Sequence, residues 1–227
     1  KTIVAAIEEG KQILSNIKKL FVYLMSNALD ELILVGGAII AGVALPLTAV
    51  QIIWVNLFTG SLPAIAFAFD KQLMKESPHT SRTLFDKRVI FLTIVIGVVI
   101  SVLLLGLYLA LLASGVNTEL ARTILFACFG SYTLFISFSF LDLSRPIYQY
   151  PLFANKLLLV GIGIGLVLLL ITLYTPFFQT MFETTHLPLI WVLFIGFWIA
   201  FNILLVELFK WFANRFLVRY EAKSLKE

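Results

Sequence analysis

The chain has 227 residues, of which 60% are hydrophobic and only 13% are charged, and its formal net charge is +4. Soluble domains carry about 25% charged residues, and a water-soluble globule of this size could not bury so much apolar surface. The composition excludes a cytosolic enzyme domain, a disordered tail and a disulfide scaffold. The basic residues flank apolar runs, which favours contact with a lipid bilayer over a nucleic-acid partner.

Residues 1–19 predict an amphipathic helix. Ile3, Ile7, Ile13 and Ile17 recur at helical spacing between charged residues. The segment lacks the layout of a secretory signal peptide. We interpret it as a cytoplasmic stalk, the end of a long helix that continues into the membrane. The alternative is an amphipathic helix that lies at the membrane interface.

Long uncharged stretches predict a bundle of six transmembrane helices, an all-α membrane protein. One crossing needs about 20 apolar residues, but the stretch Leu32–Phe69 has 38. Gly42 and Pro46 lie where this stretch should fold back, and Pro46 is suited to begin the next helix. The predicted spans are Leu20–Val43, Leu47–Phe69, Val89–Leu112, Arg122–Leu141, Leu157–Phe178 and Leu187–Phe209.

The basic residues predict the orientation. If both termini lie on one side of the membrane, 16 of the 17 Lys and Arg residues lie on that side, and only Arg122 lies on the other. The positive-inside rule makes that side cytoplasmic, and we expect the plasma membrane as the location. The predicted regions are a stalk (1–19), a helical hairpin (20–69), a cytoplasmic loop (70–88), a supporting four-helix region (89–213) and a basic cytoplasmic tail (214–227).

The first span carries polar residues at membrane depth. Asn27, Asp30 and Glu31 lie within it. Asn27 and Glu31 are four residues apart and share one helix face, whereas Asp30 is turned by about 100° from Glu31. Ionisable groups inside a membrane are costly and usually functional, so these residues are candidates for an ion pathway.

The second span predicts a broken helix near mid-membrane. Gly60 and Pro63 both weaken a helix, and Pro63 lacks a backbone N–H. A break would free carbonyl oxygens beside Asn56 and Thr59, and such oxygens together with a carboxylate suit a hard cation. The alternative is that Asn27 and Asn56 only bond neighbouring helices, and that Glu31 is buried in its protonated form.

Two motifs resemble sequences of the P-type cation-transporting ATPases, and of their calcium-pump-like branch in particular. The start of the family's fifth transmembrane helix resembles TIVAAIEEGK (2–11) with NIKK (16–19), and its sixth helix resembles PLTAVQIIWVNLFT (46–59). Shorter matches are LPA (62–64) and ART (121–123). The resemblance implies that the chain is the carboxyl-terminal transmembrane half of a cation pump.

The resemblance also implies ligands for the transported cation. The family's fifth-helix glutamate corresponds to Glu31, and its sixth-helix asparagine and threonine correspond to Asn56 and Thr59, so these three residues are the expected metal ligands. Asn27 lies one residue from the position of a further family asparagine, which is alanine in this chain.

The chain departs from the family pattern at two ligand positions. The acid expected after Thr59 is replaced by Gly60, and the eighth-helix acid or amide falls near Thr133. Asp30 is a candidate to supply the missing carboxylate if it faces the same cavity.

The family's phosphorylation motif, nucleotide-binding domain, actuator domain and first four spans do not occur in these residues. We therefore expect a portion of an enzyme that couples ATP hydrolysis, with Mg²⁺, to cation transport. The chain itself has no catalytic residue, and we expect it to hold no cofactor. The expected partners are the transported cation, the remainder of the same pump and the lipid bilayer.

Two other interpretations stay open. Six spans could form a compact bundle unaided, which would suit a stand-alone secondary transporter, a channel or a regulatory membrane subunit. The replacement of the acid by Gly60 would instead suit a degenerate pump that binds a cation without transporting it.

Overall fold

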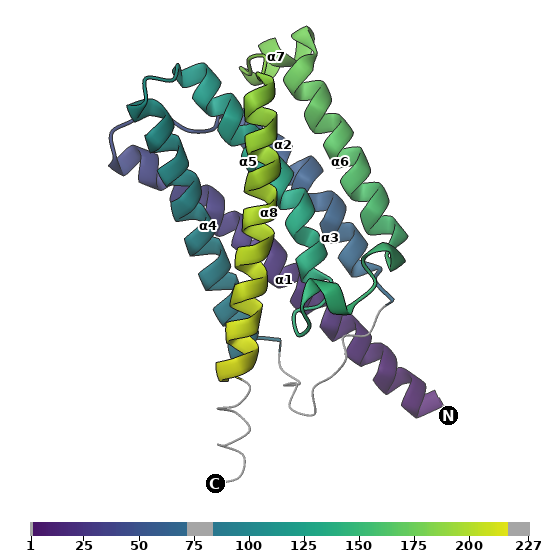
Figure 1. The fold of residues 1–227 in the computed structure, drawn as a ribbon. Coiled ribbons are helices and arrows are strands. Elements are labelled where there is room, and N and C mark those ends of the chain that lie inside the picture. Colours follow the sequence, from purple (N-terminus) through teal and green to yellow (C-terminus); the bar gives the residue numbers. More distant parts are fainter. Residues whose placement is uncertain (1, 72–83, 218–227) are drawn as a thin grey trace.

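The computed structural model describes residues 2–71 and 84–217, which form a bundle of helices (Figure 1). Within these described residues, six helical segments are long and apolar enough to cross a membrane, and they confirm the six predicted spans. Most of the predicted loop (70–88) and tail (214–227) lies outside the described residues.

The main helices are α1 (Thr2–Ile40), α2 (Ala49–Trp54), α3 (Ser61–Ala68), α4 (Lys87–Ala113), α5 (Thr118–Phe140), α6 (Lys156–Tyr174), α7 (Pro176–Phe182) and α8 (Leu189–Phe212). Short 3-10 helices are η2 (Ile147–Gln149) and η3 (Leu152–Ala154), and π-helical segments are η1 (Val55–Gly60) and η4 (Ala213–Leu217).

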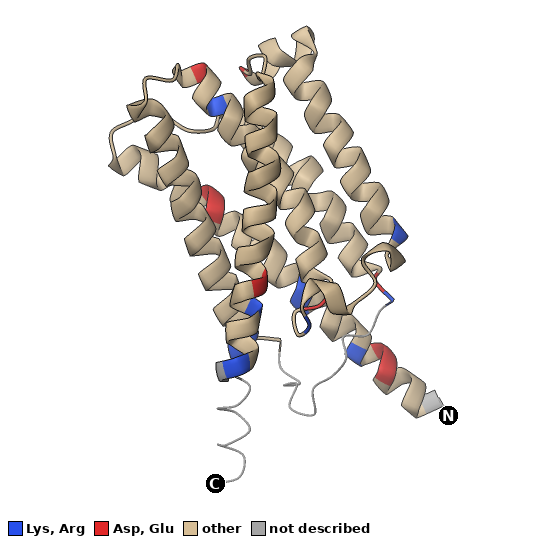
Figure 2. Cartoon of the chain, viewed as in Figure 1, with Lys and Arg blue, Asp and Glu red and all other residues tan. Residues whose placement is uncertain are grey.

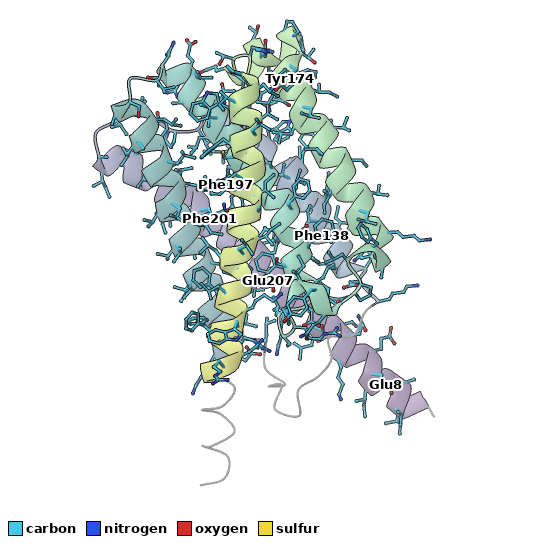
Figure 3. All side chains as sticks on the ribbon, viewed as in Figure 1. Glu8, Phe138, Tyr174, Phe197, Phe201 and Glu207 are labelled. Atoms are coloured by element: carbon cyan, nitrogen blue, oxygen red, sulfur yellow. The ribbon has the colours of Figure 1, made fainter. Side chains whose placement is uncertain are left out.

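The segment predicted as a stalk and the first span form one continuous helix, α1, of 39 residues. Its amino-terminal part projects from the bundle, with Glu8 on the projecting part (Figures 1 and 3). Helix α1 begins at the same end of the bundle at which α8 ends. Most Lys and Arg residues of the described part also gather at this end (Figure 2).

The turn after α1 follows the prediction at Gly42 but not at Pro46. Gly42 has a φ of +67°, the left-handed conformation that commonly ends a helix. The prediction that Pro46 begins the next helix is wrong, because α2 begins three residues later, at Ala49. Thr48 and Gln51 form a capping box, in which each side chain accepts a hydrogen bond from the other residue's backbone N–H. This cap determines where α2 starts.

The predicted break at Gly60 and Pro63 is not confirmed. The backbone stays helical from α2 through η1 to α3, and it only widens to a π-helical turn, in which the N–H of Ser61 donates to the carbonyl of Asn56. The carbonyl that Pro63 leaves without a helical donor is that of Thr59, four residues earlier. The hydroxyl of Tyr23 donates to this oxygen at 2.8 Å, so the chain has no need to unwind there.

Close packing between α1 and α4 depends on Gly97. A Cβ atom at this position would lie 2.8 Å from the Cβ of Leu29 and 3.2 Å from the carbonyl oxygen of Ser26. Helix α5 crosses behind α8 (Figure 1), and most of its side chains are buried. By contrast, Phe197 and Phe201 lie along the surface of α8 (Figure 3), and Phe197 is exposed, as expected of a helix that faces lipid.

The lower end of α8 is tied to the loop that follows α5. The carboxylate of Glu207 (labelled in Figure 3) accepts hydrogen bonds from the N–H of Ile147 at 3.0 Å and from Lys210 Nζ at 2.9 Å. Lys210 Nζ also donates to the carbonyl of Ser139.

Burial and the nearby carboxylates raise the pKa of the Tyr150 phenol above its usual value, so the phenol stays protonated and donates to the carbonyl of Phe138 at 2.7 Å.

The substitution Gly97→Ala should lower the stability of the bundle by about 1–3 kcal/mol, because its Cβ would displace Leu29. The matched control is Gly106→Ala, since no atom lies within 4 Å of a Cβ placed there. Alanine is about 0.5–1 kcal/mol better than glycine within a helix, so this control should not destabilise the protein. Thermal unfolding in detergent measures both variants, and equal melting temperatures would contradict the packing described above.

Candidate cation site

Two of the predicted cation ligands meet in the structure. Glu31 comes from α1 and Asn56 from η1, and the amide Nδ2 of Asn56 donates to Oε1 of Glu31 at 2.5 Å. The same amide nitrogen donates to the carbonyl of Ile52 at 3.0 Å. Glu31 is half-buried and Asn56 is exposed. A carboxylate and an amide therefore lie together on the outer face of the helical hairpin.

The surface around this pair is apolar. Leu32, Ile53 and Leu57, neighbours of the pair in sequence, are 69%, 65% and 56% exposed. Figure 2 shows one acidic stretch midway along the bundle, far from its charged ends. A carboxylate at this depth is costly if only lipid covers it. The pair therefore marks a surface that needs a polar or cationic partner.

Thr59 lies one turn further along the second span but faces another way. It is fully buried, and its Oγ1 donates to the carbonyl of Val55 at 2.8 Å. Its methyl group lies towards α5, where a Cβ added to Gly130 would come within 3.7 Å of it. Gly60 is buried beside Thr59, and an added Cβ there would make an ordinary contact of 3.5 Å with Val55. The structure gives Thr59 no hydrogen bond to Glu31 or Asn56 among its described contacts.

Asp30 is separated from the Glu31–Asn56 pair. Its side chain is almost completely buried between α4 and α5. Ser101 Oγ of α4 donates to Asp30 Oδ1 at 2.8 Å, and the hydroxyl of Tyr132 of α5 donates to Oδ2 in a closer contact. Both carboxylate oxygens of Asp30 thus have partners inside the bundle.

Asn27 and Thr133 are buried polar residues in the same part of the bundle. Within residues 2–71 and 84–217, neither Asn27 Nδ2 nor Thr133 Oγ1 has a hydrogen-bond partner. The carbonyl oxygen of Thr133 accepts from the Tyr23 hydroxyl at 3.3 Å. Unpartnered buried polar atoms are rare in folded proteins, so these two are available to a ligand or a water molecule.

The part of the chain that the structure describes contains no group of three or more His, Cys, Asp and Glu side chains that could hold a metal. Because Asp30 bonds Ser101 and Tyr132 instead, the candidate site has one carboxylate, that of Glu31, together with neutral oxygen atoms. Such a set suits a hard cation, and further ligands would have to come from other groups.

A network at the other end of the hairpin was not predicted. Gln12 Nε2 and Asn16 Nδ2 of α1 donate to the carbonyl of Asp70, just after α3, at 2.7 and 2.8 Å. Lys19 forms a fully buried ion pair with the Asp70 carboxylate at 2.7 Å. The available signal was the spacing of residues 12, 16 and 19, which places three polar side chains on one helix face.

Comparison with known proteins gives matches over most of the chain. Residues 44–212 match the family described as "Cation transporting ATPase, C-terminus". Similar curated proteins include Calcium-transporting ATPase 1 of Yarrowia lipolytica (28% identical, 82% of this chain and 20% of that protein) and Calcium-transporting ATPase 1 of Bacillus cereus (32%, 83% and 23%). The human Calcium-transporting ATPase type 2C member 1 is 27% identical over 86% of this chain and 22% of its own length. The chain thus spans about a fifth of the length of these relatives.

The substitution Tyr23→Phe should destabilise the protein by about 1–3 kcal/mol, because it removes the donor to the buried Thr59 carbonyl. The change Pro63→Ala restores a backbone N–H to the helix. In the Pro63→Ala protein, Tyr23→Phe should therefore lower the free energy of unfolding by about 1 kcal/mol less than it does in the unmodified protein. Thermal unfolding of the four proteins measures this coupling. Tyr148→Phe, at an exposed tyrosine, is the control. Additive effects of the two substitutions would show that Pro63 and Tyr23 do not share this carbonyl.

Proposed function

The chain belongs to the family of cation-transporting ATPase carboxyl-terminal regions, and on this premise we propose that it carries one side of the intramembrane cation site of an ATP-driven pump. The observation that supports the proposal most directly is the contact between Glu31 and Asn56, two residues 25 apart in sequence that meet within the apolar part of the bundle. The relatives do not favour a stand-alone transporter, channel or regulatory subunit.

Glu31 and Asn56 are the central ligands in this proposal. Asn56 now directs its amide nitrogen at Glu31, and only its oxygen can ligate a cation. Cation binding would therefore rotate the amide, so that Oδ1 and the Glu31 carboxylate face the ion together. Thr59 faces away from the pair in this structure, so its hydroxyl oxygen would join the ligands only after a movement of η1 that turns it towards the ion. Asn27, on the Glu31 side of α1, would add an amide oxygen.

The proposed cargo is a divalent cation such as Ca²⁺. The relatives are named as calcium-transporting, and the oxygen ligands of the candidate site suit a hard cation. Gly60 stands where the family has an acid, so Glu31 alone supplies a negative charge to the proposed site. With this single charge, we expect one bound cation. Ligands from the rest of the pump would complete its coordination.

The exposed face that carries Glu31 and Asn56 would be covered by other spans of the same pump. We also propose that ATP and Mg²⁺ are bound by domains outside these residues. Both ends of the chain would be cytoplasmic, in agreement with the gathering of basic residues at one end of the bundle (Figure 2). We expect the plasma membrane as the location.

Helix α1 would transmit the state of the phosphorylation domain to the cation site. It runs without interruption from its projecting end to Glu31. Near the bundle surface, Asn16 and Lys19 bind Asp70 at the end of α3, and Lys18 pairs with Asp86 at the start of α4 at 2.7 Å. A displacement of the projecting part would therefore move the end of α3 and the start of α4 together with α1.

The substitution Glu31→Gln in the full-length protein should abolish cation-stimulated ATP hydrolysis, because it removes the carboxylate from the pair while it keeps the side-chain shape. The matched control is Glu119→Gln, at an exposed position in the first turn of α5, which should leave the stimulation unchanged. Undiminished stimulation in the Glu31→Gln protein would contradict the ligand assignment.

Vesicles that contain the full-length protein should accumulate ⁴⁵Ca²⁺ when ATP is supplied, and a Glu31→Gln protein should not. This measurement separates an active pump from one that binds a cation without transport, the alternative suggested by Gly60. Saturable binding of Ca²⁺ without ATP-dependent uptake would support the degenerate pump.

A further inference from the structure

A stripe of polar side chains runs along one face of α1, and every member bonds another part of the bundle. The members follow one another at intervals of four and three residues, so at about 100° per residue they lie within an arc of about 80°. They are Gln12, Asn16, Lys19, Tyr23, Ser26 and Asp30. Their partners are Asp70, Thr59, Thr133, Thr93, Ser101 and Tyr132.

Asp30 is the last member of this polar stripe, and it is the one that binds two helices through side chains. Ser101 holds one carboxylate oxygen from α4, and Tyr132 holds the other from α5. Both hydroxyl residues are buried, with exposures of 0% and 1%. Helix α4 can approach α1 closely here because Gly97, one turn before Ser101, has no side chain.

The bonds of Asp30 determine where Glu31 points. The two residues are consecutive in one α-helix, so their side chains differ in direction by about 100°. When Asp30 is held between α4 and α5, Glu31 must point towards the face on which Asn56 lies, and the two are in fact bonded. A rotation of α1 that released Asp30 would also separate Glu31 from Asn56.

We propose that Asp30 is a positioning residue, which sets the rotation of α1 and thereby presents Glu31 to Asn56. Asp30 acts through its bonds to Ser101 and Tyr132, and it does not itself contact the cation. The effect on cation affinity rests on the proposed function, whereas the effect on the position of Glu31 does not.

The substitution Asp30→Asn separates positioning from ligation. An amide at this position can donate to Ser101 and accept from Tyr132, so it keeps both bonds while it removes the charge. Asp30→Ala removes both bonds, and Tyr132→Phe removes one of them while it keeps the ring. Ser137→Ala is the control, because this buried hydroxyl of α5 bonds only the carbonyl of Leu134 in its own helix among the described contacts.

Cross-linking measures the position of Glu31 without any cation. The full-length protein is prepared with Glu31→Cys, Asn56→Cys and Cys128→Ala, and a short bifunctional thiol reagent is applied to membranes. The cross-linked peptide is quantified by mass spectrometry. We expect Asp30→Ala and Tyr132→Phe to reduce the yield by about tenfold, and Asp30→Asn and Ser137→Ala to leave it within about twofold.

Binding of ⁴⁵Ca²⁺ to membranes containing the full-length protein gives the second measurement. Glu31 and Asn56 are left intact in this measurement. Asp30→Ala and Tyr132→Phe should each raise the half-saturating Ca²⁺ concentration about tenfold. Asp30→Asn should leave it within about twofold of the value for the unmodified protein. The double variant Asp30→Ala/Tyr132→Phe should bind no more weakly than Asp30→Ala alone, because both changes remove the same bond.

Two results would overturn the proposal. If Asp30→Asn weakens Ca²⁺ binding as much as Asp30→Ala does, the charge of Asp30 is required and the residue acts as a ligand. If Asp30→Ala and Tyr132→Phe leave the cross-linking yield unchanged, Asp30 does not position Glu31. Failure of the proposed function has a different signature, in which Glu31→Gln leaves Ca²⁺ binding unchanged although the cross-linking results follow the expectation.

Discussion

The rotation of α1 about its own axis is the constraint on which the rest of the structure depends. Apolar helices in lipid gain little from one rotation over another, because the lipid is as apolar as the side chains. Buried polar groups without partners, by contrast, are costly. The polar stripe of α1 therefore selects one orientation: a rotation by one residue, about 100°, would remove its bonds to α3, α4 and α5 together.

The same polar stripe explains why the second span stays helical. Pro63 deprives the Thr59 carbonyl of its usual donor, and Tyr23 replaces that donor from α1. The π-helical segment η1 and the first span are thus joined at the level of the candidate site. Helix α1 runs without a break from its projecting end, past the residues that bind Asp70, to Glu31 at the candidate site. A movement of the projecting end would therefore be transmitted along the helix to the site.

Much of the architecture was predictable because it depends on local properties. Hydropathy and length were sufficient for the six spans, and Gly42 marked the fold-back by its conformational freedom. The motif around Asn56 and the acid at Glu31 indicated two residues that the structure brings together. The start of α2 was mispredicted, because the capping box of Thr48 and Gln51 outweighs the preference of Pro46 for a first helical turn. The break at Gly60 was mispredicted, because a neighbouring helix satisfies the freed carbonyl.

The sequence by itself determined which six segments are long and apolar enough to cross a membrane, as the described residues confirm, and that acids and amides interrupt the first two. Each of these properties belongs to a single segment and can be read from composition and spacing. Only the tertiary structure decided that Asp30 turns inward to Ser101 and Tyr132 while Glu31 turns outward to Asn56. The two carboxylates are adjacent in sequence, and their directions depend on which donors the other helices place beside them.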